Sequence, residues 1–481
     1  MKRLTLAVRR VLPKNSFARG VSVLVGGTAG AQLLTVLAAP LLTRLYTPED
    51  FGLLAVYGSL LALISVIASL RYELAIPLPE DDQEAANVAA LCLLLIAGTT
   101  LLSVLATVFL GEYISNALGV PALAAYLWLL PLGVLLGGGY TVFNYWAVRN
   151  KDFKKIAGTK IIQSLAGLAI QITGYKLGVI AMLSGQIAGQ SAGILKLAKS
   201  ALTLHTFKQI SSAGIIQAAN RYKKFPIYSS GAALFNTAST HAVPILFSIF
   251  YGPIFAGFYV LAHRVLLMPA ALIGSAISQI FLSEGKTKRD KQMLPKKTLA
   301  IHSKLAFVAM PAMYFFLLYG PMSFSYIFGN SWEKSGLYSQ ILAPWVYLVF
   351  TASPISSVNT ILEKQKFSFI FDGVMFMARL GSLYIGYKFL DIYDSVLLFG
   401  VVSSILVIVF IYFTFSFLSI GVSKWLAIHA RAMAVGLVLF VFPYFMFNEF
   451  MQNKILPVSL HMITAISLYF YIFIRSPGSK A

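Results

Sequence analysis

Two arginines lie deep inside apolar stretches, where an ionisable side chain is costly. Arg264 stands in the run F-Y-V-L-A-H-R-V-L-L-M-P at 258–269, and Arg379 lies near the middle of another apolar run. A charged group at the centre of a spanning helix costs about 2.5–3.5 kcal/mol, and such residues mostly face a cavity or a partner. Arg264 is therefore expected to face a cavity and a ligand, with snorkelling or helix pairing as the alternative. For Arg379, a substrate contact and an ion pair with Asp372, seven residues earlier, both stay open.

Two further arginines stand at the ends of apolar runs. Arg44 ends the first run and Arg71 ends the second, so each is a candidate anion contact or a simple boundary anchor. Glu73 is only two residues from Arg71, too close for the pair to face each other along one helix. We therefore expect Arg71 and Glu73 to pair with other helices or to meet a head group.

Other polar residues within apolar runs are candidates for lining a cavity. His241 follows Asn236 by about one and a half helical turns, and His263 directly precedes Arg264. The alternative for His241 is a packed histidine that is hydrogen-bonded within the helix bundle.

The signatures of catalysis and nucleotide hydrolysis are missing. The six histidines are scattered, and neither H-E-x-x-H nor G-x-x-x-x-G-K-[ST] occurs. The dense acidic cluster at 80–84 is expected to be a solvated helix start, because acids favour helix N-termini. The single Cys92 excludes a disulfide framework within the chain and argues against a cysteine metal site. We expect no metal, no cofactor and no enzymatic activity.

The composition places these residues in a membrane protein. Of 481 residues, 58% are hydrophobic and only 11% are charged, against about 25% charged in soluble proteins. The mean hydropathy is +0.78. Stretches of about 20 apolar residues, without the alternation of a β-barrel, predict spanning helices. We predict an all-α integral membrane protein with about fourteen such helices, near 20–43, 51–70, 85–110, 121–147, 157–174, 178–196, 226–250, 254–282, 301–320, 337–361, 367–388, 395–418, 425–447 and 455–474.

The basic residues predict the orientation of these helices. The chain has 38 Lys and Arg against 17 Asp and Glu, a net charge of +21. If the N-terminus is cytoplasmic, 31 of the 38 fall in inside segments and five in outside segments. Cytoplasmic loops carry such an excess, so both termini are predicted to lie inside. The first apolar run is longer than a signal-peptide core, which predicts an uncleaved first helix.

A short internal repeat divides the spans. Y-T-P-E-D-F-G at 46–52 and Y-G-P-I-F-A-G at 251–257 share Tyr, Pro and Gly at an offset of 205 residues. We expect Pro to fix φ in a tight external turn there, and Gly to supply an unusual φ. The offset covers an even number of spans and predicts two parallel, pseudo-symmetric six-helix lobes. The predicted divisions are a basic N-terminus at 1–19, lobes at 20–196 and 226–418, a connector at 197–225, and two additional helices with a short cytoplasmic tail at 419–481.

Four longer passages carry a family resemblance. R-L-Y-T-P-E-D-F-G-L-L at 44–54, S-L-R-Y-E-L-A-I-P-L-P-E-D-D at 69–82, N-R-Y-K-K-F-P at 220–226, and G-F-Y-V-L-A-H-R-V-L-L-M-P-A-A-L-I-G-S-A-I-S-Q-I-F at 257–281 resemble the polysaccharide repeat-unit flippases of the MOP superfamily. These are the Wzx-type O-antigen, capsule and exopolysaccharide flippases. Arg264 and Pro269, as R-x-x-x-x-P, also resemble the lipid II flippases. Beyond about residue 300 the resemblance is one of hydropathy and topology alone.

The resemblance implies two six-helix lobes around a central cavity, two extra C-terminal helices in some members, and transport by alternating access. It implies a substrate, an oligosaccharide on polyprenyl diphosphate, flipped from the inner to the outer leaflet of the cell membrane for surface polysaccharide such as lipopolysaccharide. Membrane lipid, a polymerase and chain-length proteins are expected partners, and nucleic acid is not. Arg264 matches a family arginine, and Arg44 and Arg71 are weaker matches, as contacts for the diphosphate, which suits forked donors. Arg379 is a candidate for the same role from its place in an apolar run, and not from the resemblance. Asp372 and Glu73 are candidates for ion coupling.

Two alternatives stay open. A multidrug cation exporter would share the fold, but it would need acidic residues in its cavity, and the first predicted helix contains none. A membrane polysaccharide polymerase or ligase would need a sizeable outside loop for its catalytic groups, and no such loop is clear.

Overall fold

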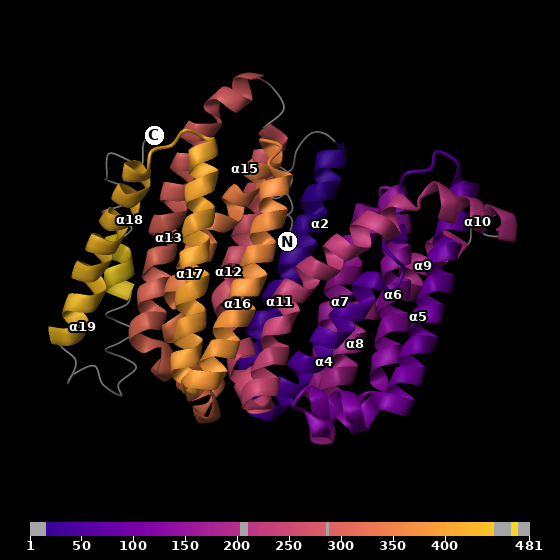
Figure 1. Ribbon diagram of the computed structural model, residues 1–481, viewed down its shortest axis with the longest axis horizontal. Helices are drawn as coiled ribbons and strands as arrows, with labels where there is room; N and C mark the ends of the chain where they lie inside the picture. The colour runs from indigo at the N-terminus through magenta and orange to yellow at the C-terminus, as the bar shows by residue number, and fades with distance from the viewer. Residues whose placement is uncertain (1–15, 203–209, 285–287, 447–462, 470–481) are drawn as a thin grey trace, which may run out of the picture. The chain divides into compact units, whose positions relative to one another are not determined.

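The computed structural model describes residues 16–202, 210–284, 288–446 and 463–469. These residues are almost entirely helical, and among them no strand is found. They divide into two compact units, Met1–Gly257 and Phe258–Ala481. The long helix α12 (Pro253–Glu284) begins in the first unit and continues into the second (Figure 1).

The first unit is a helical bundle with short connections. Its core includes Val56, Leu61, Ile96 and Trp146, which are almost completely buried. Its α-helices are α2 (Ser16–Leu37), α3 (Ala39–Leu45), α4 (Pro48–Ile67), α5 (Asp82–Ala117), α6 (Leu129–Arg149), α7 (Phe153–Thr173), α8 (Val179–Ser191), α9 (Ile194–Leu202), α10 (Ser212–Arg221) and α11 (Ser230–Tyr251). Short 3-10 turns include η1 (Tyr72–Ala75) and η2 (Pro121–Tyr126).

The second unit contains longer helices. Its core joins α13 and α14 through residues such as Met310, Tyr314 and Tyr347. The helices after α12 are α13 (Lys288–Phe328), α14 (Glu333–Ala352), α15 (Ser356–Ile361), α16 (Gln365–Phe389), α17 (Ile392–Phe417), α18 (Val422–Gly436) and α19 (Phe442–Met446).

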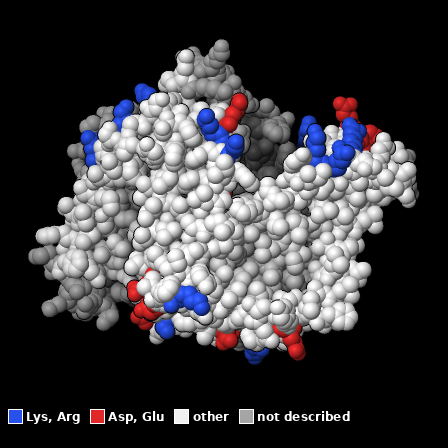
Figure 2. Space-filling view, viewed as in Figure 1, with Lys and Arg blue, Asp and Glu red and all other residues white. Residues whose placement is uncertain are grey.

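Ten helices among the described residues are long and apolar enough to cross a membrane, and Pro253–Met268 is a shorter apolar stretch. Each of the fourteen predicted spans overlaps a helix, although the last overlaps only at 463–469 and otherwise lies outside the described residues. The prediction of an all-α, multi-pass membrane protein is confirmed. On the face drawn in Figure 2, charged side chains gather at the ends of the helices and the surface between them is uncharged.

Polar side chains inside the first unit join its helices. The Gln163 amide of α7 donates to the carbonyl oxygen of Gln190 in α8 at 2.6 Å, and Gln171 donates to Met182 at 3.1 Å. The Tyr46 hydroxyl donates to the Gln171 carbonyl at 2.7 Å. In lipid, backbone and side-chain polar groups must find partners within the protein, and these bonds supply them.

The two repeated heptads contact each other within the first unit. Pro48 and Pro253 are the first residues of α4 and α12, a position where the missing N–H costs nothing. A Cβ atom on Gly52 would collide with the carbonyl oxygen of Pro253, and one on Gly257 would collide with that of Pro48. The prediction of an unusual φ at these glycines is wrong, because neither has a positive φ. Glycine is required there because two helix starts cross backbone to backbone.

Candidate functional site

Arg264 is an accessible cation within the apolar part of α12. It lies in the second unit, eleven residues after the helix begins at Pro253, and its side chain is exposed. Within the part of the chain that the structure describes, no hydrogen bond or ion pair holds its guanidinium. An accessible arginine at this depth is available to an anionic ligand, since its donors are not used internally.

The repeat gives Arg264 an uncharged counterpart in the first unit. At the offset of 205 residues, Arg264 corresponds to Ser59 of α4. Ser59 is buried, and its hydroxyl lies 3.4 Å from Nδ1 of His241 on α11. His241 is thus half-buried and hydrogen-bonded between two helices, whereas Asn236 on the same helix is exposed. The intramembrane charge at this position belongs to the second repeat alone.

Arg71 and Glu73 form an ion pair, with Nη1 and Oε1 at 3.2 Å. The expectation that they are too close to face each other is wrong, because the two residues do not lie on one α-helix: Arg71 directly precedes the 3-10 turn η1, and Glu73 lies within it. Leu70 and Arg71 have left-handed backbone conformations, with φ of 49° and 62°. With this turn, the two side chains meet although only one residue separates them in the sequence. Glu73 is 3% exposed and also accepts a hydrogen bond from Ser69, so the pair holds a carboxylate out of solvent.

The remaining predicted residues occupy separate places. Arg44 is exposed at the end of α3. Arg379 and Asp372 lie on α16 but form no ion pair among the described residues, and Asp372 is exposed. Instead, Arg379 donates from Nε to the Ser403 hydroxyl at 3.2 Å and lies over the Trp345 ring. His263 stacks on the same Trp345, so the structure brings His263 and Arg379 to one indole.

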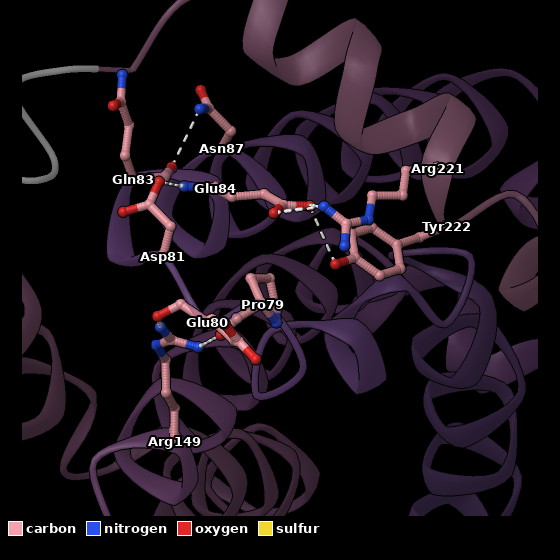
Figure 3. A network of polar contacts seen from close by, with 9 residues as sticks. All are labelled: Pro79, Glu80, Asp81, Gln83, Glu84, Asn87, Arg149, Arg221 and Tyr222. Atoms are coloured by element: carbon pink, nitrogen blue, oxygen red, sulfur yellow. Dashed lines mark hydrogen bonds and ion pairs between the residues drawn. The ribbon is translucent and has the colours of Figure 1, made fainter.

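The acidic cluster at 80–84 binds arginines, in addition to beginning α5 as predicted (Figure 3). Asp81 caps the helix by accepting from the Glu84 backbone N–H at 3.2 Å. Arg149, at the end of α6, donates to Asp82 at 2.7 and 3.0 Å and to the carbonyl oxygens of Pro79 and Glu80. The Arg149 guanidinium thus binds the loop before α5 to the end of α6.

Glu84 holds the connector helix α10 to the same place. Arg221 donates from Nη1 to both carboxylate oxygens of Glu84 at 2.7 Å, and the Tyr222 hydroxyl donates to Oε1 at 3.0 Å (Figure 3). Burial raises the pKa of Tyr222 above its ordinary value, and its hydrogen bond to Glu84 raises it further. At the other end of α10, the Ser211 N–H donates to the Asn87 side chain at 3.2 Å.

Sequence reasoning did not find Arg149, Arg221 or Trp345. The two arginines stand among many basic residues of segments that orient the protein, so their type gives no separate signal. Among the described residues, no group of three or more His, Cys, Asp or Glu is placed to hold a metal ion. The contacts assembled on the described residues are arginine–carboxylate pairs and an arginine–indole contact.

A family model described as "Polysaccharide biosynthesis protein" matches residues 41–336. The succinoglycan biosynthesis transport protein ExoT of Rhizobium meliloti (strain 1021) is 24% identical over 313 residues, or 64% of this chain. That match spans 60% of the relative's own length, less than two thirds.

The fold is similar to that of solved membrane transporters. The lipid II flippase MurJ in an inward closed conformation superimposes with a TM-score of 0.74 and 15% identity, covering 94% of this chain and 98% of that one. An inward-facing multidrug resistance MATE family transporter of the MOP superfamily gives a TM-score of 0.64 and 16% identity, covering 81% and 94%. At these identities the likeness concerns the fold. Since the family model covers more than half of its length, the chain belongs to the family of polysaccharide biosynthesis proteins.

Proposed function

We propose that this protein flips a polyprenyl-diphosphate-linked oligosaccharide from the cytoplasmic to the outer leaflet of the cell membrane, for surface polysaccharide biosynthesis. The transport is by alternating access of the two repeat-related halves, with both termini in the cytoplasm. A polymerase and chain-length proteins are the partners that would use the flipped unit. The family membership and the transporter fold support the class of activity.

The observation that carries the proposal is the state of Arg264. Its guanidinium is accessible, stands in an apolar helix and has no partner among the described residues. A diphosphate carries about two negative charges, and an arginine binds it through two parallel N–H donors. Arg44 and Arg71 are proposed as secondary contacts along the path.

The two carboxylates proposed for ion coupling differ in their surroundings. Glu73 is 3% exposed and bound to Ser69 and Arg71, whereas Asp372 is exposed on α16. A buried carboxylate whose arginine partner moves to a ligand is left without its counter-charge, and this favours uptake of a cation. We therefore place coupling at Glu73 first and at Asp372 second.

The test is translocation of a fluorescent polyprenyl-diphosphate-linked oligosaccharide in proteoliposomes that contain the full chain. Arg264→Ala is expected to slow translocation at least about tenfold, and Arg264→Lys to restore part of it, because lysine keeps the charge without the forked donors. Arg431→Ala, an exposed arginine of α18, is the matched control. Wild-type rates in both Arg264 variants would remove Arg264 from the mechanism.

Cells that lack this protein distinguish a flippase from a polymerase, and drug transport by the purified protein tests the multidrug exporter. Deletion is expected to accumulate lipid-linked units on the inner leaflet, whereas accumulation on the outer leaflet would identify a polymerase. Export of cationic drugs by the purified protein, without movement of lipid-linked sugar, would identify a multidrug exporter.

A further inference from the structure

Four aromatic rings form a closed circuit inside the second unit. Tyr259 stacks on His263 with ring centroids 5.2 Å apart, and His263 stacks on Trp345 at 5.8 Å and an interplanar angle of 27°. Trp345 meets Phe399 edge-on at 5.6 Å, and Phe399 meets Tyr259 edge-on at 6.1 Å. The rings come from α12, α14 and α17, so the circuit fixes three helices against one another.

Trp345 is the member of this circuit that also holds a charge. The guanidinium carbon of Arg379, on α16, lies 5.3 Å from the Trp345 ring centroid. Cations over an indole face are attracted to its π-electrons, most strongly where water is excluded. Trp345 is 4% exposed, so the contact lies at the edge of a dry core.

The hydrogen bonds of Arg379 leave its terminal donors available. Its Nε donates to Ser403, which is completely buried, at 3.2 Å. Among the described residues this is its one recorded hydrogen bond, and neither Nη nitrogen takes part in an ion pair. The Trp345 ring and the Ser403 hydroxyl therefore hold the Arg379 guanidinium in place. Among the described residues, no partner uses its terminal N–H groups.

The indole N–H of Trp345 is a second unused donor. It is buried and has no hydrogen-bond partner within the described part of the chain. An unpaired buried donor of this kind costs stability, and a core chosen for packing alone would place phenylalanine or leucine there. Stability alone therefore does not account for tryptophan at this position.

We infer that Trp345 is a positioning residue for anion binding, because its ring holds the Arg379 guanidinium in place. The ligand class is a prenyl-linked diphosphate or another phosphate anion. The inference rests on the proposed function for its biological meaning, but its binding step can be measured separately.

The experiment measures the Kd of the full-length, detergent-purified protein for farnesyl diphosphate by calorimetry, in a double-mutant cycle of Trp345→Leu and Arg379→Gln. Each single substitution is expected to weaken binding about tenfold, and the double substitution no more than either alone, because Trp345 acts through Arg379. Trp345→Phe keeps the ring and should lose only about threefold.

The control for folding is Trp332→Leu, at a fully buried tryptophan of the same unit that contacts Phe258. It should lower the Tm and leave the Kd unchanged. Additive effects of Trp345→Leu and Arg379→Gln on the Kd would overturn the inference, as would a wild-type protein that does not bind farnesyl diphosphate. If the wild type binds it but moves no lipid-linked oligosaccharide in proteoliposomes, the proposed function fails and the positioning role stands.

Discussion

Gly52 lies against the main chain of Pro253 with no room for a side chain between them. The repeat makes the same contact a second time, between Gly257 and Pro48. Two helices that start with the same heptad therefore cross at their first turns in a locally two-fold arrangement. The packing at this crossing is backbone on backbone, so it tolerates no Cβ on either glycine.

We expect Gly52→Ala to lower the free energy of unfolding by about 1–3 kcal/mol, because the new methyl group forces α4 and α12 apart. Thermal unfolding in detergent measures the change as a lower Tm. Gly98→Ala is the matched control, since Gly98 lies within α5 with nothing within 4 Å of its Cβ position. It should gain about 0.5–1 kcal/mol from helix propensity. A wild-type Tm for Gly52→Ala would contradict the crossing.

The left-handed turn at Leu70 predicts a stabilising substitution. A non-glycine residue with φ near 49° carries about 1–2 kcal/mol of strain, which glycine avoids. Leu70 is 39% exposed, so Leu70→Gly removes only part of the packing of a buried leucine, and we expect the relief of strain to raise the Tm. Leu78→Gly, at an exposed leucine without positive φ, should lower it. If both glycines lower the Tm equally, the turn is not strained.

Charge reversal tests the docking of α10. Glu84→Arg or Arg221→Glu alone should each destabilise the protein by about 1 kcal/mol, because a like-charge contact replaces an ion pair. The double reversal should regain most of the lost Tm. Since Arg221 is more than half exposed, about 1 M salt should shrink the differences. Lys223→Glu, at the neighbouring exposed lysine, controls for net charge. A double variant no better than the singles would contradict direct pairing.

Tyr222 predicts a loss of stability in alkaline solution. Burial and the bond to Glu84 raise its pKa in the folded state, so folding favours the neutral hydroxyl. The unfolded chain then loses its proton first, and this stabilisation is complete below about pH 10 and declines as pH rises through the raised folded-state pKa. Below pH 10, Tyr222→Phe should have a Tm below that of the wild type. The two curves should converge as pH rises, and a gap that does not change with pH would refute the role of the hydroxyl.

The spans were predictable because each must hide about 20 residues of backbone in apolar side chains. This requirement produces long runs of apolar residues that are visible in the sequence. The run predicted at 226–250 begins within a few residues of the irregular start of α11. The helices α9 and α10 were missed because they are short and lie in or beside the segment predicted as a connector, where nothing requires a helix. The function of Gly52 was misjudged because a glycine at a turn and a glycine at a crossing look the same in sequence.

The pairs in the candidate site depend on contacts that a linear reading does not contain. Arg71 reaches Glu73 because Leu70 and Arg71 adopt left-handed backbone conformations. Leucine and arginine rarely do so, and their residue types therefore do not predict this turn. Asp82 and Arg149 are 67 residues apart, and Glu84 and Arg221 are 137 apart. By contrast, Arg264 was found because a charge in an apolar run is visible in any sequence.

The separation of Glu84 from Arg221 has a consequence for biogenesis. The chain is made from its N-terminus, so α5 enters the membrane when its partner arginine has not yet been synthesised. Until α10 emerges, the carboxylate of Glu84 lacks that counter-ion, and the intervening helices α6 to α9 are synthesised during this interval. Docking of α10 is therefore a late event in the maturation of the first unit. In a nascent chain arrested before residue 221, the start of α5 would lack its ion pair with α10 while the insertion and quality-control machinery acts on it.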